Sequence, residues 1–436
     1  MEMLEKNKFS LFTATMMNIN VMVGAGAFIM PSLMARKASA LSFLGWTSVA
    51  IIFFPLVWSI SQITQLFSEQ SSFYHYSEKG LNKTVGFISG WTYYLGYASM
   101  AATVNMALQE ILGNQMKIQV VANYPITFNI IFIIIFCLLN LLNLSHISKI
   151  QNASTIFKLF PILFVISIMF FYYNPHLNFD WQNIGQVKYA IPLALFGFWG
   201  FESSSNISHL IKGGKKNASK SVLIGFISAG IIYSLFHFGL LEIMNVNNLI
   251  NFGSPSFVKF LGINSQLFKT LLNGIVTSAI ITSYASCVFG IFLSNSSNLH
   301  AMVNENLFPF SNIIKKTNKN NRPTFCVWGI GITSILLIVL INNKVVLTSV
   351  SNLGILISFL LTIISMVIIQ KKKRVHFIKI IPTLLAFVSC TILAYYSWLI
   401  MGPNNVARLI NFLPLVLLIL GGTIVYKLHY NKITNS

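Results

Sequence analysis

The sequence predicts an all-α membrane protein with about twelve transmembrane helices. Of its 436 residues, 55% are hydrophobic and only 9% are charged, and the mean hydropathy is +0.71. Soluble domains carry about a quarter charged residues, so lipid is the expected solvent. Apolar stretches long enough to cross a bilayer recur along the whole chain, which is too many for one signal peptide or anchor.

The predicted spans are continuously apolar, whereas strands of a membrane barrel alternate in polarity over about ten residues. Each is therefore expected to be a helix. The predicted ranges are 10–34, 38–66, 84–113, 124–144, 152–174, 188–211, 218–243, 266–300, 324–342, 345–370, 377–401 and 404–428.

The basic residues sort by side of the membrane. With an internal N-terminus, the inside segments hold 21 and the outside segments 8 of the 29 Lys and Arg residues, a count that places Lys149 and Lys158 inside. This positive-inside asymmetry predicts that both termini are cytoplasmic. It also explains the net charge of +20 without a nucleic acid partner. The run from Lys371 to Arg374 is read as a positive-inside loop without a binding function, the alternatives being anionic lipid or nucleic acid.

Enzyme chemistry has little support. Only nine acidic residues exist, and we find no nucleophile motif, Walker loop or paired-carboxylate site. The cysteines lie singly in different spans, without metal-site or redox spacing, and are expected to be buried packing residues. These are Cys137, Cys287, Cys326 and Cys390. The sequence therefore predicts neither an enzyme nor a bound cofactor or metal.

Two glycine-rich interruptions lie within predicted spans. The first, Val23-Gly24-Ala25-Gly26-Ala27-Phe28, falls in the middle of the first span. Glycine is unfavourable inside a helix, and this pair lets the backbone open and approach a ligand. The functional interpretation is a broken helix. A small-residue packing face is the alternative, although its usual small-xxx-small spacing does not fit.

The second interruption, FGFWGFESSS from Phe196 to Ser205, lies in the middle of the sixth span. It contains Glu202, and a charge at that depth is costly unless it faces a cavity or a partner. Because the two interruptions are five helices apart, they predict two inverted five-helix repeats, 10–174 and 188–370, followed by two additional helices in 377–428. Broken helices of this kind meet near the midplane and offer amide ends to an anion and carbonyls to a cation.

Further short motifs occur in a specific order. Phe73-Tyr74-His75-Tyr76 precedes the third span, Val85 to Trp91 opens it, and Leu307-Phe308-Pro309 followed by Arg322-Pro323 comes after the eighth. Together with the two interruptions they resemble the amino acid-polyamine-organocation transporter superfamily over nearly the whole chain. The resemblance implies a leucine-transporter-type fold with helices one and six broken.

Within that superfamily the chain is most similar to the basic amino acid and polyamine antiporters. The glycine motif is followed by Pro31, and the segment Gly200-Phe201-Glu202-Ser203 resembles that family's motif in the sixth helix. The resemblance implies that amides of the first break bind the substrate carboxylate, that carbonyls of the second bind the amine, and that Phe196 is an aromatic gate. The substrate-binding residues implied are Val23, Gly24, Ala25, Gly26, Phe196, Gly197, Trp199, Gly200 and, on the third helix, Tyr93, Gly96, Tyr97 and Ala101.

Two positions depart from the arginine-type members of that family. Ala101 stands where they place a polar amide, and Ala25 where they place a serine between glycines. A buried guanidinium needs several acceptors, so these losses argue against arginine. We expect a neutral amino acid as substrate, with exchange of a cationic amino acid or polyamine as the alternative.

Titratable groups inside the spans suggest coupling. Lys158 either snorkels to the cytoplasmic face or, as the resemblance implies, supplies an ammonium between helices one and eight. Glu202 is a candidate for gating because it lies deep in the sixth span and because the resemblance places it at the second break. His237 is expected to be a hydrogen-bonded packing residue.

The resulting prediction is a secondary active transporter of the bacterial inner membrane. It is expected to carry a small-molecule amino acid by alternating access without ATP, and to be proton-linked or sodium-independent. The protein is expected to be a monomer or a homodimer. The alternative from another class is an amino acid sensor that does not transport. The short tails argue against that alternative, because a receptor usually carries a long soluble signalling domain.

Overall fold

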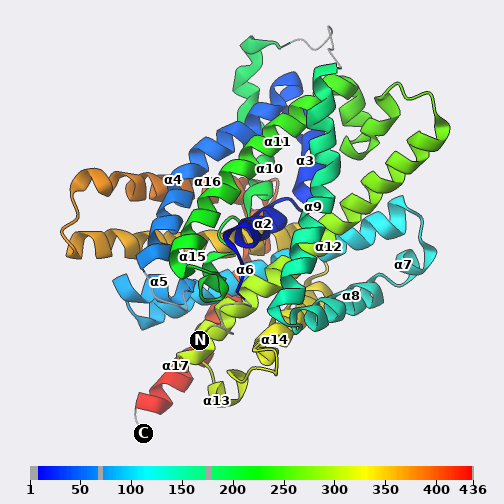
Figure 1. Ribbon diagram of the computed structural model, residues 1–436. Helices are drawn as coiled ribbons and strands as arrows, with labels where there is room; N and C mark the ends of the chain where they lie inside the picture. Colours follow the sequence, from blue (N-terminus) through cyan, green and yellow to red (C-terminus); the bar gives the residue numbers. More distant parts are fainter. Residues whose placement is uncertain (1–7, 67–71, 172–178, 435–436) are drawn as a thin grey trace.

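The computed structural model describes residues 8–66, 72–171 and 179–434, and in these residues every regular element is a helix. The helices form one bundle, with α2 (Leu11–Met22) near the centre of the view in Figure 1 and α9, α11 and α12 packed around it. One isolated parallel bridge joins Phe9 to Ile211.

Each predicted span coincides with one or more helical elements. After α2 come α3 (Ala25–Ala38), α4 (Leu44–Leu66), α6 (Lys83–Glu110), α8 (Pro125–Asn140), α9 (Leu144–Ile168), α10 (Ile191–Leu195), α11 (Gly214–Phe252), α12 (Gln266–Asn304), α14 (Thr324–Ile341), α15 (Lys344–Lys372), α16 (Ile381–Ile400) and α17 (Asn405–Thr434). Shorter elements connect them, namely η1 (Ser39–Phe43), α5 (Phe73–Gly80), η2 (Ile111–Gln115), α7 (Gln119–Asn123), η3 (Met169–Phe171), η4 (Trp181–Tyr189), η5 (Phe196–Phe198), η6 (Ser205–Leu210), η7 (Ser254–Phe260), α13 (Ser311–Ile314) and η8 (Phe377–Lys379).

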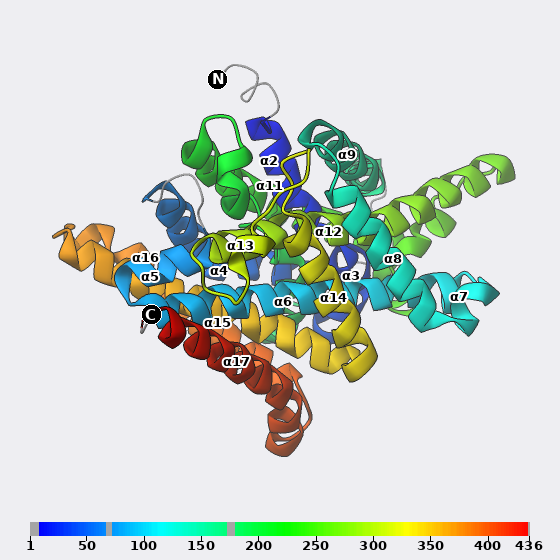
Figure 2. The same cartoon turned by 90° about the horizontal axis from the view of Figure 1, so that it is seen from below.

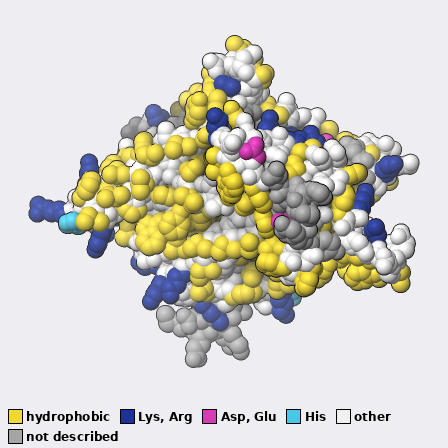
Figure 3. Space-filling model, turned by 90° about the horizontal axis from the view of Figure 1, so that it is seen from above, with side chains coloured by type: hydrophobic (Ala, Val, Ile, Leu, Met, Phe, Trp, Pro, Cys, Tyr) yellow, Lys and Arg dark blue, Asp and Glu magenta, His cyan; other side chains and the backbone are white. Residues whose placement is uncertain are grey.

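The exterior is that of a multi-pass membrane protein. Eight helical stretches in the described residues are long and apolar enough to cross a bilayer, and α2 and α8 are shorter apolar helices. Large hydrophobic side chains are exposed on their outer faces, for example Ile131 on α8 and Leu413 on α17. Figure 3 shows hydrophobic side chains over much of the face viewed, with Lys and Arg mainly toward its periphery. Such a surface is stable only in lipid.

Local sequence explains where several helices begin. Ser and Asn side chains accept hydrogen bonds from first-turn amides that would otherwise lack a partner. These N-caps are Ser10 for α2, Ser72 for α5, Asn82 for α6, Asn143 for α9, Ser265 for α12 and Asn343 for α15. Asn143 starts α9 earlier than the sequence predicted, so Lys158 lies deeper in its helix than expected.

The pairing of α6 with α15 brings the third and tenth spans together, as the view from below shows (Figure 2). Glycines allow this close approach. A Cβ on Gly96 would lie 2.9 Å from the Ile355 amide nitrogen, and one on Gly354 would lie 3.1 Å from the Gly96 Cα. This packing fixes α6 beside the sixth span and positions Tyr93 and Tyr97 of α6 toward Glu202.

Candidate functional site

The first span is interrupted at the predicted glycine motif. Helix α2 ends at Met22, Val23 leaves the helical region at φ −75° and ψ 66°, and α3 begins at Ala25. Gly24 precedes α3 with φ −100° and ψ −142°, and no side chain caps this helix start. The first-turn amides of α3 therefore point toward the break without a side-chain partner. The side chain of Ala25 lies outside the described part of the structure.

The carbonyls that the break leaves at the end of α2 are taken by side chains of α9 and α12. Lys158 Nζ donates to the Asn20 carbonyl at 2.6 Å. Ser283 Oγ donates to the Val23 carbonyl at 2.8 Å, and the Cys287 thiol donates to that of Val21 at 3.3 Å. Because buried carbonyls need donors, these side chains stabilise the opened backbone.

The sixth span opens in the same way. Helix α10 tightens into η5, Trp199 is extended at ψ 134°, and Gly200 adopts φ +103° before the chain turns into η6. Only glycine adopts such a backbone without strain. A Cβ on Gly200 would lie 2.2 Å from Val21 Cγ1, so the two opened spans touch here.

The two breaks face each other. A Cβ on Gly26 would lie 3.3 Å from Gly197 Cα and 3.3 Å from Phe196 Cδ1. Farther along, Asn18 of α2 both donates to Ser204 Oγ at 2.9 Å and accepts from the Ser204 amide at 2.8 Å. The predicted residues Gly24, Gly26, Phe196, Gly197 and Gly200 are thus brought together.

Glu202 is fully buried and directed at α6. Its Oε1 accepts a hydrogen bond from the Tyr93 hydroxyl at 3.0 Å and a shorter one from that of Tyr97. Asn206 of η6 donates to the Tyr93 oxygen at 2.8 Å and to Ser294 Oγ at 3.0 Å. The Glu202 Oε2 atom is buried without a hydrogen-bond partner in the described residues. The carboxyl group of Glu202 therefore accepts two hydrogen bonds from tyrosine hydroxyls at Oε1, and its Oε2 has no partner among the described residues.

The remaining predicted residues of the third helix lie on the same element. Tyr93 stacks on Phe73 with ring centroids 4.2 Å apart, and Gly96 lies at the crossing with α15 described above. Ala101 is buried farther along α6. Trp199 donates from its indole nitrogen to Asn352 Oδ1 at 2.9 Å, which ties the second break to α15.

Lys158 does not snorkel. Its side chain is fully buried, and besides the Asn20 carbonyl it contacts Ser286 Oγ of α12 at 3.3 Å. Its count among the inside loop charges is therefore wrong. The asymmetry of the other basic residues is unaffected. The ammonium lies between the first and eighth spans.

His237 is satisfied on both ring nitrogens, as expected of a packing histidine. The Trp46 indole donates to Nδ1 at 3.1 Å, so Nε2 carries the proton and donates to Ser42 Oγ at 3.1 Å. The Trp46 ring in turn packs on Gly197, where a Cβ would lie 2.6 Å away. Tyr233 donates to the Gly197 carbonyl at 2.9 Å.

Helix α12 has a polar face that was not predicted from the sequence. Ser283, Cys287 and Ser294 all bond to backbone carbonyls of the two breaks. The prediction that all four cysteines are buried is confirmed, and all four are free. Cys287 also donates a hydrogen bond, which was not predicted. A stripe of small polar residues at three- and four-residue spacing within an apolar span was the available signal.

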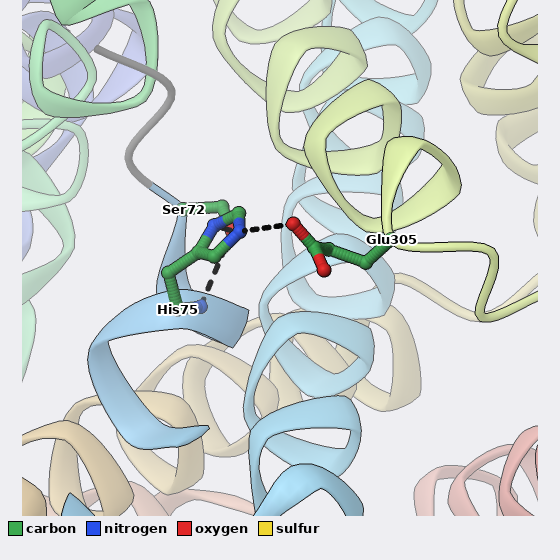
Figure 4. A network of polar contacts seen from close by, with 3 residues as sticks. All are labelled: Ser72, His75 and Glu305. Carbon is green, nitrogen blue, oxygen red and sulfur yellow. Dashed lines mark hydrogen bonds and ion pairs between the residues drawn. The ribbon is translucent and has the colours of Figure 1, made fainter. Parts of the chain in front are cut away.

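Directly after the end of α12, the chain contacts α5. His75 Nε2 and Glu305 Oε1 lie 3.2 Å apart, and Ser72 contacts the other ring nitrogen at 2.9 Å (Figure 4). The pair is partly exposed, with side-chain exposures of 20% and 47%. Its contribution to stability is therefore expected to be below about 1 kcal/mol.

Comparison with known proteins places this architecture in a family. Residues 9–422 match the amino acid permease family. The serine/threonine exchanger SteT of Bacillus subtilis (strain 168) is 21% identical over 390 residues, covering 86% of this chain and 87% of the relative. The putrescine transporter PotE of Escherichia coli (strain K12) is 21% identical over 397 residues, with the same coverages. The branched-chain amino acid permease BcaP of Bacillus subtilis (strain 168) is 21% identical over 445 residues, covering 91% of each.

The family match extends over most of the chain and includes both breaks. The chain therefore belongs to the amino acid permease family, within the amino acid-polyamine-organocation superfamily. Its relatives are membrane transporters with different named substrates. The family thus establishes the class of protein and leaves the substrate to the residues of the site.

Proposed function

We propose that this protein is a secondary active amino acid transporter whose substrate binds where the first and sixth spans are broken. The observation that carries the proposal is the uncapped start of α3 after Gly24, whose first-turn residue Gly26 lies directly beside the opened backbone at Phe196 and Gly197. Amides at a helix start and the positive end of its dipole favour a carboxylate. Carbonyls of the second break offer acceptors to an ammonium, and the one on Gly197 retains a lone pair beside Tyr233.

A neutral amino acid is the proposed substrate. Glu202 is the only buried acidic side chain among the described residues, and its Oε1 is already bonded to Tyr93 and Tyr97. The unpartnered Glu202 Oε2 is the one charged acceptor left there among the described residues, whereas a cationic side chain or a second ammonium carries several donors that all need acceptors once buried. The small residues Ala25 and Ala101 supply none. The alternative, a cationic amino acid or polyamine antiporter, is favoured by the motif resemblance around Gly24 and Gly200 and by the names of some relatives.

The mechanism proposed is alternating access by twelve spans. Residues 10–174 and 188–370 form the two five-helix repeats, and 377–428 supplies two further helices. The bundle containing spans one and six moves against the others. We place the protein in a bacterial-type inner membrane with both termini cytoplasmic, because the basic residues gather on that side.

Proton linkage is proposed through Lys158 and Glu202. The ammonium of Lys158 holds the end of α2 against α12, so loss of its proton would weaken that contact. The carboxyl group of Glu202 is fully buried, and its Oε2 has no hydrogen-bond partner among the described residues. A buried group of this kind is poised to change its protonation when the surrounding helices move.

Purified protein in proteoliposomes tests the proposal. Uptake of labelled serine against internal serine should exceed that of empty liposomes, and a panel of unlabelled neutral amino acids should compete. Gly26→Val, which fills the space against Gly197, should abolish uptake while the protein still inserts. Binding without flux would indicate a sensor. Competition by arginine or putrescine alone would favour the antiporter alternative.

A further inference from the structure

A large basic cavity lies beyond the second break, at the end of the bundle where α2 begins and α12 ends. Its volume is about 720 Å³, and its walls come from the segment before α2, the start of α9, the end of η6, α12 and the loop before α14. The cationic or titratable side chains in its lining are Lys8, His209, His300, Lys319 and Arg322. We call this cavity the basic pocket.

Among the described residues, no acidic side chain belongs to the lining of the basic pocket. The next carboxylate after His300 in the chain is that of Glu305, directly after the end of α12. Glu305 does not line the pocket and is directed toward His75 (Figure 4). The described part of the pocket wall therefore supplies no carboxylate to neutralise its positive charges. A cavity lined by charges of one sign concentrates ions of the opposite sign.

Arg322 is the buried charge of this wall. The residue is only 1% exposed, and its Nε donates to the Asn140 carbonyl at 3.1 Å. Its Nη2 is buried without a hydrogen-bond partner, and no carboxylate of the described residues forms an ion pair with it. Burial lowers the pKa of Arg322 to about 10, so the guanidinium stays charged at neutral pH. A buried charge without a counter-ion is costly, and a bound anion would relieve that cost.

Helix α12 connects the basic pocket to the central site. Ser294 of α12 donates to the Ser203 carbonyl and accepts from Asn206. Ser297 and His300 follow on the same helix and line the pocket. At ~1.5 Å of rise per residue, His300 lies about 9 Å beyond Ser294 along the helix axis. A solute leaving the breaks toward this end would therefore meet the pocket within about two helical turns.

We propose that the basic pocket is an anion-binding site that takes the carboxylate of an amino acid as it passes between the central breaks and the cytoplasm. The inference rests on the proposed function and deepens it by naming the chemical group that is recognised on this side. It selects against polyamines, which carry only positive charge. It favours substrates with a carboxylate, whatever their side chain.

Thiol labelling measures the predicted potential. Thr317 is exposed and lines the pocket, so Thr317→Cys offers a reactive thiol against four buried native cysteines. Anionic and cationic methanethiosulfonate reagents are compared on the protein in nanodiscs, each normalised to its rate with a free thiol. We expect the anionic reagent to react at least threefold faster. Lys319→Gln should lower that preference about two- to threefold, as removal of one nearby charge in water predicts.

Lys316→Gln is the matched control, because Lys316 is adjacent to Thr317 in the sequence, is exposed and does not line the pocket. It should change the preference less than Lys319→Gln does. Equal rates for the two reagents, or a larger effect of Lys316→Gln, would overturn the anion site. Serine and acetate should slow labelling, whereas serinamide and putrescine should not. Protection by serinamide as well as serine would overturn recognition of the carboxylate.

Serine flux separates this inference from the proposed function. Lys319→Gln should lower serine exchange in proteoliposomes at least twofold relative to Lys316→Gln. If acetate protects Thr317→Cys but serine exchange is identical in both variants, the pocket holds a free anion and the substrate assignment is wrong. If no amino acid is transported although the labelling preference is present, the proposed function fails while the anion site stands.

Discussion

Replacing Gly200 with alanine is expected to strain the opened backbone of the sixth span and to lower the free energy of unfolding measurably. The residue has φ +103°, and an added Cβ would lie 2.2 Å from Val21 Cγ1 and 2.6 Å from Val21 Cβ. A left-handed backbone costs an L-residue about 1–2 kcal/mol. Overpacking in a filled core adds about 1–3 kcal/mol, so Gly200→Ala should lose roughly 2–5 kcal/mol.

Gly274→Ala is the control for this substitution. Gly274 lies in α12, and no atom is within 4 Å of an added Cβ. Alanine there should be neutral or stabilise the helix by up to about 1 kcal/mol. Thermal unfolding in detergent, followed by intrinsic fluorescence, compares the two variants, and serine exchange in proteoliposomes compares their transport.

Gly200→Ala should melt well below the wild-type protein and lose exchange, while Gly274→Ala should match the wild type in both. Movement of Val21 cannot remove the whole cost, because the backbone strain is independent of that contact. Equal stability and exchange of the two alanine variants would refute the geometry assigned to the sixth span.

Three further predictions concern side chains around the breaks. Lys158→Met should cost about 1.5–3 kcal/mol in thermal unfolding and flatten the pH dependence of uptake, because a charged donor to the Asn20 carbonyl is lost; an unchanged pH profile would remove Lys158 from coupling. Glu202→Gln keeps an acceptor for the tyrosines but cannot titrate, so membrane insertion should persist and the pH profile of uptake should shift; a wild-type profile would make Glu202 structural. Ser283→Ala should lose about 1 kcal/mol and raise the KM for serine, because the Val23 carbonyl loses its donor; wild-type stability and KM would contradict this role.

Hydropathy and glycine chemistry carried most of the prediction of the helices. Every predicted span coincides with helical elements, and the interruptions at Gly24 and Gly200 lie within the predicted motifs. Such features are local, since length, polarity and the freedom of glycine are properties of short segments. The start of α9 was missed because its Asn143 cap lies within a less apolar stretch.

Contacts between distant segments could not be read in the same way. Lys158 left two interpretations open, and only the position of α2 and α12 around it decides between them. The sequence predicted Tyr93 and Tyr97 beside a substrate but did not reveal that their hydroxyls donate to Glu202, more than 100 positions away. The donors on α12 went unnoticed because a serine in a helix usually bonds to its own backbone.

An experimental structure of the protein in nanodiscs with saturating serine tests the central claim most directly. The account predicts ligand density between the start of α3 and the backbone at 196–200, with the carboxylate at the amides that follow Gly24. Continuous helices through the first and sixth spans, or serine bound elsewhere with the breaks empty, would contradict it.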